Sequence, residues 1–194
     1  MVVSYYITDT LSQRLKIMTQ RATISKIRSF EASSSAKTEL GYMRAICSSR
    51  GVAQLIWQQQ PFSAADSQES DVSRETIAQL SDYLAGQLTR FTIPLDLSAR
   101  TSAAQRWLEV MNRIPYGQTI SYADCAALWG NRKASRAAGF ACRQNLIPII
   151  LPCHRIVQSS GGHDNYSGGD VTNPRDQNNI KRKQWLISLE AQNN

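Results

Sequence analysis

A cysteine and a histidine stand next to each other at Cys153 and His154, in a chain with four cysteines and two histidines. The thiolate form of cysteine is a strong nucleophile, and a neighbouring base is the usual way to generate it at neutral pH. Five apolar residues and Pro148 lead into this pair over residues 146–151, and a Ser-Ser-Gly-Gly turn follows at 159–162. This pattern predicts a buried strand or extended segment that brings Cys153 to the floor of a cleft.

A second interpretation of Cys153 is a small core residue, since most cysteines in chains of this kind serve packing alone. Adjacent residues on an extended segment also point to opposite faces, so His154 could take the thiol proton only through a water or a local bend. Spacing alone leaves both interpretations open.

The composition narrows the classes of partner. The 194 residues suit one ordinary domain or two small ones. The 22 basic and 15 acidic residues give a net charge of +7, which favours DNA, RNA or anionic lipid, although many basic proteins bind none of these. Without a CxxC pair, the four cysteines predict reduced thiols inside a cell. We expect no zinc site, no secretory signal and no membrane span.

The pattern divides the chain into two lobes, with a boundary near Ser98. The predicted elements before it are an extension at 1–26, a hairpin at 41–47 and 52–57, a loop at 58–73, an amphipathic helix at 74–88 and an extended segment at 91–97. Those after it are a helix at 102–112 with Trp107, Leu108 and Met111 facing inward, short helices at 122–128 and 133–143, and a closing helix at 181–191. The chain between 170 and 179 is predicted to be an exposed excursion.

Two short helices joined by a few residues with a glycine are typical of a helix-turn-helix, although such pairs also occur in protein cores. Thr119 and Ser121 are candidate caps for the first helix. Small residues on the second helix would let its backbone approach another polymer, and basic neighbours could neutralise phosphates. The small residues are Ala134, Ser135, Ala137, Ala138, Gly139 and Ala141, and the basic ones are Lys133, Arg136 and Arg143.

In the closing helix, Trp185, Leu186 and Leu189 share one face. Glu190 lies in its final turn, where a negative charge is mildly unfavourable because the helix dipole is negative there. We therefore consider a specific partner for Glu190.

Five segments, in order, resemble the O6-alkylguanine-DNA alkyltransferases, also called methylated-DNA–protein-cysteine methyltransferases. The resemblance covers roughly residues 29–194 and is dense from Arg90 onward. The segments are Arg113 to Tyr122, Ala134 to Gly139, Arg143 to Asn145, Pro152 to Ile156 and Asn165 to Gly169.

The resemblance implies an α+β fold. Its N-terminal lobe, 27–98, would hold a small antiparallel sheet and helices, and its mostly helical C-terminal lobe, 99–194, a winged-helix-like helix-turn-helix. It implies a monomer that acts on double-stranded DNA carrying O6-alkylguanine, without cofactor or metal, in the bacterial cytoplasm or the nucleus. Cooperative binding along DNA stays open.

The resemblance also implies residue roles. The second helix enters the minor groove, Arg136 replaces the extruded nucleotide, and Tyr122 helps to turn that nucleotide out. Asn131 and Ser159 contact the backbone. The expected DNA-binding set is completed by Lys133, Ala134, Ala137 and Gly139.

In the implied pocket, Tyr166 stacks on the guanine and Ser167 donates a hydrogen bond to its alkylated oxygen. Cys153 accepts the alkyl group, while His154 acts through a water and is oriented by Glu190. Asn145 braces the loop. The remaining pocket residues would be Gly168, Cys142, Pro148 and Ile156.

The chemistry is consistent with these roles. Transfer of an alkyl group is an in-line displacement at an sp³ carbon, which suits a soft thiolate. Guanine leaves poorly as an anion, so the pocket must donate hydrogen bonds or a proton, and Tyr122 is a candidate donor. The target atom lies inside the duplex and requires base flipping. The thioether is stable, so each molecule would react once. The expected substrates are O6-alkylguanine and also O4-alkylthymine.

The chain departs from the family pattern in four places. About ten additional residues lie between Gly169 and Lys183, Ser102 to Ala104 replace an aromatic residue before Gln105, Cys142 stands where a larger residue is usual, and a zinc-binding cysteine and histidine set is missing. Three alternatives stay open: a lesion binder that does not transfer, a helix-turn-helix transcription factor with a core cysteine, and a truncated adaptive-response regulator.

Overall fold

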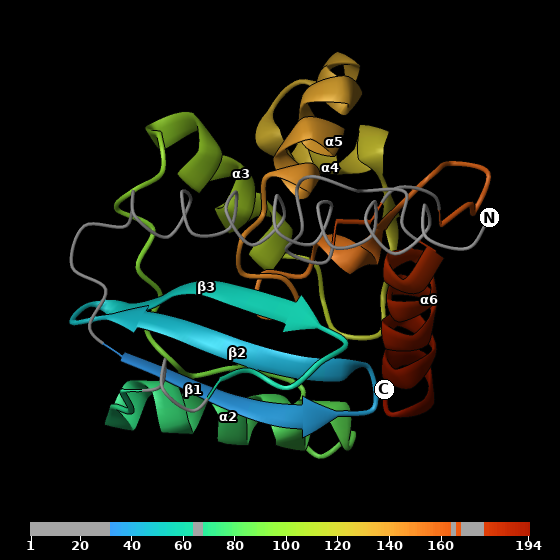
Figure 1. The fold of residues 1–194 in the computed structure, drawn as a ribbon. Helices are drawn as coiled ribbons and strands as arrows, with labels where there is room; N and C mark the ends of the chain where they lie inside the picture. Colours follow the sequence, from blue (N-terminus) through green and yellow to red (C-terminus); the bar gives the residue numbers. More distant parts are fainter. Residues whose placement is uncertain (1–31, 64–67, 164–165, 168–176) are drawn as a thin grey trace, which may run out of the picture.

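The computed structural model describes residues 32–63, 68–163, 166–167 and 177–194. The predicted extension at 1–26, Gly168 and most of the excursion after residue 170 lie outside these ranges. Helices and a small antiparallel sheet confirm the α+β class (Figure 1).

The predicted hairpin is confirmed as strands β2 (Gly41–Ser48) and β3 (Gly51–Gln58), which pair antiparallel. Gly51 makes the turn, because it has a φ of 142° and a Cβ there would lie 2.4 Å from the carbonyl oxygen of Pro94. A further strand, β1 (Ala32–Thr38), pairs antiparallel with the outer side of β2. The sequence did not predict β1, because its serine-rich composition lacks the apolar alternation of a strand.

Helix α2 (Asp71–Leu84) packs against the sheet. It begins three residues earlier than predicted, because Ser70 and Ser73 form a capping box at its start. It ends at Leu84 rather than residue 88, ahead of Gly86, whose φ is 74°. Beyond it, residues 91–97 are extended as predicted, and Val52 exchanges backbone hydrogen bonds of 2.9 and 2.8 Å with Pro94 and Asp96.

Helix α3 (Ser102–Asn112) has the predicted bounds, and the predicted inward residues Trp107, Leu108 and Met111 are buried. The short helix is α4 (Tyr122–Trp129), which is capped by Ser121 rather than Thr119. Gly130 ends it with a φ of 111°.

The second short helix begins as the 3-10 helix η2 (Arg132–Ala134) and continues as α5 (Ser135–Arg143). Helices α3, α4 and α5 lie above the three-stranded sheet in Figure 1, and α2 lies below it. The predicted pair of short helices, α4 and α5, is therefore present, and Gly130, Asn131 and η2 connect them.

The prediction of a buried strand or extended segment is wrong at Cys153 itself. Cys153 begins the 3-10 helix η3 (Cys153–Arg155), which a 3.0 Å hydrogen bond from the Arg155 amide to the Pro152 carbonyl closes. The turn satisfies backbone groups locally that a strand would pair with a neighbour. Pairing resumes directly afterwards, where β5 (Ile156–Val157) lies parallel to β4 (Ile120–Ser121).

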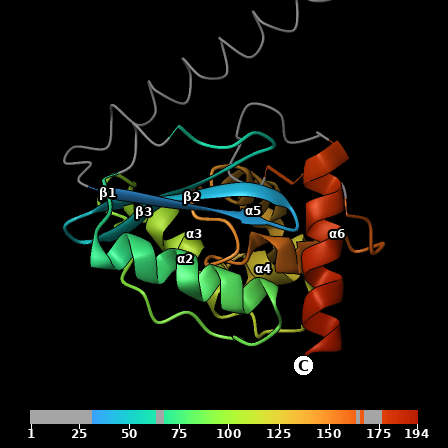
Figure 2. The same ribbon diagram turned by 60° about the horizontal axis from the view of Figure 1, so that its bottom comes forward.

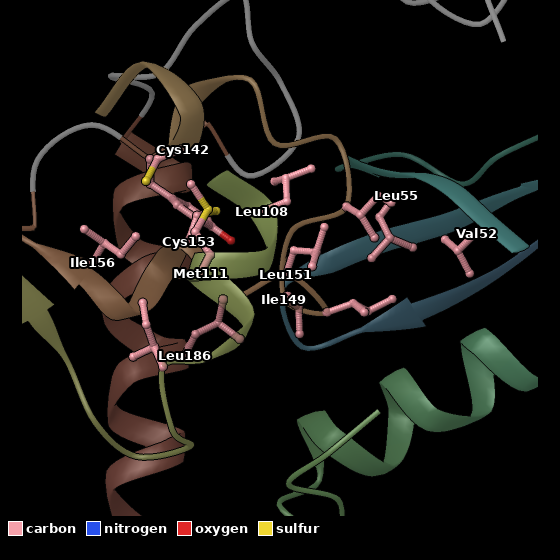
Figure 3. Close-up of a cluster of buried hydrophobic side chains, with 14 of the residues drawn as sticks. Val52, Leu55, Leu108, Met111, Cys142, Ile149, Leu151, Cys153, Ile156 and Leu186 are labelled. Atoms are coloured by element: carbon pink, nitrogen blue, oxygen red, sulfur yellow. The ribbon is translucent and has the colours of Figure 1, made fainter. Parts of the chain in front are cut away.

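The closing helix is α6 (Gln177–Gln192), which stands at one edge of the molecule in Figure 2. It begins four residues earlier than predicted, so residues 177–179 are helical rather than part of an exposed excursion, and Asn179 is buried. Its Leu186 belongs to a single apolar cluster that also contains Leu55, Met111 and Ile156. Figure 3 shows Cys153 within this cluster. The cluster spans both sides of Ser98, so the lobe boundary stays a prediction. None of the described helices has the length and apolar character needed to cross a membrane.

Candidate active site and DNA-binding surface

Asn145 holds both the Cys153 thiol and the loop that leads to it. Its Nδ2 donates to Cys153 Sγ at 3.1 Å and to the Leu151 carbonyl at 2.8 Å. Its Oδ1 accepts from the Ile147 amide at 2.9 Å. Both Asn145 and Cys153 are buried, with exposed fractions of 0% and 2%. One amide side chain therefore fixes the sulfur relative to the loop.

Strain is stored in this loop at Ile149, the non-glycine residue with a positive φ (74°) among those described. Such a conformation costs about 1–3 kcal/mol and persists where the surroundings impose it. The Leu55 amide of β3 donates to the Leu146 carbonyl at 2.8 Å, which ties the loop to the sheet. Asn145 holds its other end, so the loop reaches Cys153 in one conformation.

The Cys153 thiol lies between opposing influences. Burial raises its pKa, while the hydrogen bond from Asn145 and the charge of Lys183 lower it. Lys183 is 1% exposed, donates from Nζ to the Ile156 carbonyl at 2.6 Å and faces the Tyr122 ring at 5.8 Å. The site therefore holds a thiol at rest but contains groups that favour its thiolate.

A buried network surrounds Glu190, which is 2% exposed. His154 Nε2 lies 2.5 Å from Glu190 Oε1, and the Tyr83 hydroxyl donates to the same oxygen. Arg155 Nε donates to Oε2 at 2.9 Å, and the Gly117 amide donates there at 3.0 Å. The partner that the sequence led us to consider for Glu190 is thus a set of four.

This network fixes the charges. Burial raises the pKa of Glu190, but hydrogen bonds from His154, Arg155 and Tyr83 outweigh it and lower the pKa to about 2. Burial lowers the pKa of His154, so its ring is neutral at pH 7. With Nε2–H assigned as the donor to Glu190, the buried Nδ1 is an acceptor without a partner among the described residues.

Two buried hydroxyls belong to residues that the resemblance predicts to line the pocket. Tyr166 and Ser167 are 2% and 3% exposed, and neither hydroxyl has a hydrogen-bond partner in the described part of the chain. Asn179 of α6 donates to the Ser167 carbonyl at 3.1 Å. Burying an unpaired hydroxyl costs roughly 1–3 kcal/mol, so these groups are suited to a polar ligand.

Of the other predicted pocket residues, Gly168 lies outside the described residues. Cys142 lies close to Cys153 (Figure 3), while Pro148 and Ile156 are buried. Tyr122 is half-buried at the start of α4, and burial raises its pKa, so its phenol stays protonated.

The predicted DNA-binding residues lie at or near the surface, unlike the buried residues around Cys153. Asn131, Lys133, Arg136, Ala137 and Ser159 are exposed, whereas Ala134 and Gly139 are half-buried. Asn131 Oδ1 accepts from the Lys133 amide at 3.0 Å and so caps η2. Gly139 lies against Tyr122, since a Cβ at this glycine would lie 3.8 Å from the ring. The helix with Arg136 therefore packs directly on a residue of the candidate pocket.

Sequence reasoning missed Tyr83, Arg155 and Lys183. Arg155 lay inside the Pro-Cys-His-Arg segment, so its position was a usable signal. Tyr83 and Lys183 gave none, because a tyrosine or lysine on an amphipathic helix is usually exposed at its polar end. Among the described residues, no group of three His, Cys, Asp or Glu side chains could hold a metal ion.

Comparison with known proteins agrees with this geometry. The family described as "6-O-methylguanine DNA methyltransferase, DNA binding domain" matches residues 102–192. The methylated-DNA–protein-cysteine methyltransferase of Mycobacterium leprae is 40% identical over 122 residues, which cover 63% of this chain and 67% of that protein. The protein of that name from Mycobacterium bovis is 41% identical over 114 residues, covering 59% and 62%.

Solved structures show the same relationship. The crystal structure of Mycobacterium tuberculosis O6-methylguanine methyltransferase matches with a TM-score of 0.69 and 30% identity, over 84% of this chain and 94% of that one. That organism's OGT in complex with DNA matches with a TM-score of 0.68 and 30% identity, over 83% and 93%. The chain therefore belongs to the family of methylated-DNA–protein-cysteine methyltransferases, which act in DNA repair.

Proposed function

We propose that this protein repairs DNA by moving the alkyl group of O6-alkylguanine onto its own Cys153, once per molecule and as a monomer. The observation that carries the proposal is the setting of the sulfur. The thiol is buried, Asn145 donates a hydrogen bond to it, and the charge of Lys183 favours its thiolate. The hydroxyls of Tyr166 and Ser167 are also buried and have no partners among the described residues.

The first step generates the thiolate. A water that bridges Cys153 Sγ and His154 Nδ1 passes the thiol proton to the imidazole. Glu190 stabilises the imidazolium through Nε2, at 2.5 Å, while Arg155 and Tyr83 hold the carboxylate in place. Asn145 and Lys183 lower the free energy of the thiolate. This relay removes the need for His154 to touch the sulfur.

The second step is the displacement. The thiolate attacks the alkyl carbon, the S–C bond forms as the C–O bond breaks, and the electron pair remains on the guanine. Ser167 donates a hydrogen bond to O6, Tyr122 donates to the leaving base, and Tyr166 stacks on its ring. The product thioether is stable, which ends the activity of that molecule.

Access to the base requires the exposed helix. In our proposal α5 enters the minor groove, Arg136 fills the space of the extruded nucleotide, and Asn131, Lys133 and Ser159 contact the backbone. Flipping costs a few kcal/mol, and it costs less when the base pair is weakened by damage. In our proposal, O4-alkylthymine is a second substrate because its base pair is also damaged. Because Cys153 is 2% exposed, the base enters a site that the surrounding residues must open.

Titration against a duplex with one O6-methylguanine tests this function. The wild type should restore one guanine per protein molecule and then stop. Cys153→Ala should restore none, whereas Cys47→Ala, which removes a buried thiol of β2, should keep the stoichiometry. Repair beyond one equivalent, or tight lesion binding without any repair, would rule the proposal out.

A further inference from the structure

Phe140 is a large apolar side chain on the surface of the helix that we assign to DNA. Among the described residues, Phe140 and Leu128 are the exposed large hydrophobic side chains, at 57% and 54%. Phe140 lies one helical turn after Arg136 in α5. The guanidinium of Arg143 lies 5.6 Å from the centre of its ring. An aromatic ring is thus held between two arginines on one helix face.

The ring also borders a cavity. A space of about 360 Å³ lies between the start of α3 and the exposed side of α5. Phe140, Ala137 and Ala141 line it from α5, and Ala104 and Trp107 line it from α3. The wall is therefore apolar and shallow, because the alanines leave the aromatic side chain standing above them.

The charge around this cavity favours a polyanion. Neither residues 97–108 nor residues 130–145 contain an aspartate or glutamate. The basic residues in these two stretches are Arg100, Arg106, Arg132, Lys133, Arg136 and Arg143, of which Arg100 lines the cavity and Arg132 is paired with Asp124. An apolar docking segment of a protein partner would gain little from these positive charges, whereas a nucleic-acid backbone releases counterions when it binds basic side chains.

We propose that Phe140 is a second wedge on DNA, which packs its ring against the sugar and base edge of a nucleotide next to the flipped one. This inference rests on the proposed function. Four residues of helix rise about 6 Å, and base pairs are 3.4 Å apart, so the ring meets DNA within about two steps of Arg136. Apolar side chains at such positions lean into a base step and hold the duplex bent.

The division of labour with Arg143 follows from the contact between them. The Arg143 guanidinium lies over one side of the Phe140 ring, so its donors can reach a phosphate while the opposite face of the ring can contact the sugar. Phe140 then supplies affinity that does not depend on salt, and Arg143 supplies affinity that does. The two contributions can be measured separately.

The test compares Phe140→Ala with the matched control Leu128→Ala, which removes the other exposed apolar side chain. Duplex affinity of Phe140→Ala should fall roughly tenfold, as expected for loss of one aromatic contact with a nucleotide. The slope of affinity against salt concentration should not change. Arg143→Ala should instead reduce that slope by about one. Leu128→Ala should change neither quantity.

Two further measurements separate a DNA contact from a structural role. Reaction of Phe140→Ala with free O6-benzylguanine should match the wild type, and thermal unfolding should show the same folded state. With 2-aminopurine next to the lesion, the wild type should raise its fluorescence by unstacking it, and Phe140→Ala should not. Unchanged duplex affinity and fluorescence in Phe140→Ala, or equal losses on both substrates, would overturn the wedge.

Failure of the proposed function would look different. In that case the wild type itself would leave Cys153 unmodified with both the duplex and free O6-benzylguanine. A wild type that alkylates Cys153, together with a Phe140→Ala variant that repairs duplex at the wild-type rate, refutes the wedge alone.

Discussion

Helices α5 and α6 carry comparable charged residues in opposite environments. On α5, Arg136 and Arg143 are exposed. On α6, Arg182, Lys183 and Glu190 are buried, with exposed fractions of 8%, 1% and 2%. The buried charges are hydrogen-bonded to the backbone and to other side chains, as buried ions must be. The exposed ones point to solvent.

This contrast separates recognition from chemistry. A buried charge that loses its partner is destabilising, so α6 should control both folding and reactivity on every substrate. An exposed arginine contributes little to stability and is available to phosphates, so α5 should control reaction in duplex DNA alone. Substitutions on the two helices should therefore produce two different patterns of loss.

The largest effect is expected for Glu190→Gln. The change leaves Arg155 buried without its carboxylate, which typically costs 3–5 kcal/mol. Urea unfolding should show this loss, and reaction with free O6-benzylguanine should slow because His154 loses its orienting partner. Glu109→Gln, an exposed carboxylate on α3, is the matched control and should stay within about 0.5 kcal/mol. A stable and fully reactive Glu190→Gln would remove the contrast.

The second effect is the acid dependence of stability. The Glu190 pKa is lower in the folded state than the ordinary value of 4.5, so its contribution is complete above that value and is lost as pH falls towards 2. Between pH 6 and pH 2, the free energy of unfolding should therefore fall more steeply in the wild type than in Glu190→Gln. Parallel curves would contradict this.

Arg136→Ala tests the same contrast on the exposed helix α5. Duplex repair should slow about 100-fold, because the space left by the extruded nucleotide stays unfilled, while reaction with free O6-benzylguanine stays at the wild-type rate. The free energy of unfolding should change by less than about 0.5 kcal/mol. Arg74→Ala on α2 is an exposed control that should affect neither substrate. Equal slowing on both substrates would make Arg136 a structural residue.

The smallest effect is expected for Lys183→Met, about tenfold in rate. Loss of the ammonium raises the pKa of the Cys153 thiol, so the rate should fall equally in duplex and with free O6-benzylguanine. The pH at which the reaction rate rises should therefore be higher in Lys183→Met than in the wild type. Lys181→Met removes an exposed lysine about half a turn away on the same helix and should change neither the rate nor its pH dependence. An unchanged pH profile in Lys183→Met would show that Lys183 only packs.

The same contrast explains what the sequence could predict. The bounds of α3 and the α4–α5 pair followed from periodicity and caps, and the Cys153–His154 pair followed from residue type. Tyr83 meets Glu190 across 107 positions, a contact that packing creates and no local pattern contains. The prediction of a strand or extended segment at Cys153 was wrong because the backbone there forms a turn. Local rules thus predicted the helices better than the buried side-chain network that joins them.

The central claim is that Cys153 receives the alkyl group, and mapping the modified residue tests it most directly. The protein should be incubated with a duplex that carries O6-methylguanine, digested, and its cysteine peptides analysed by mass spectrometry. We predict one added methyl group on the Cys153 peptide and none on the peptides of Cys47, Cys125 or Cys142. A methyl group on another cysteine, or restored guanine beside an unmodified Cys153, would contradict the account.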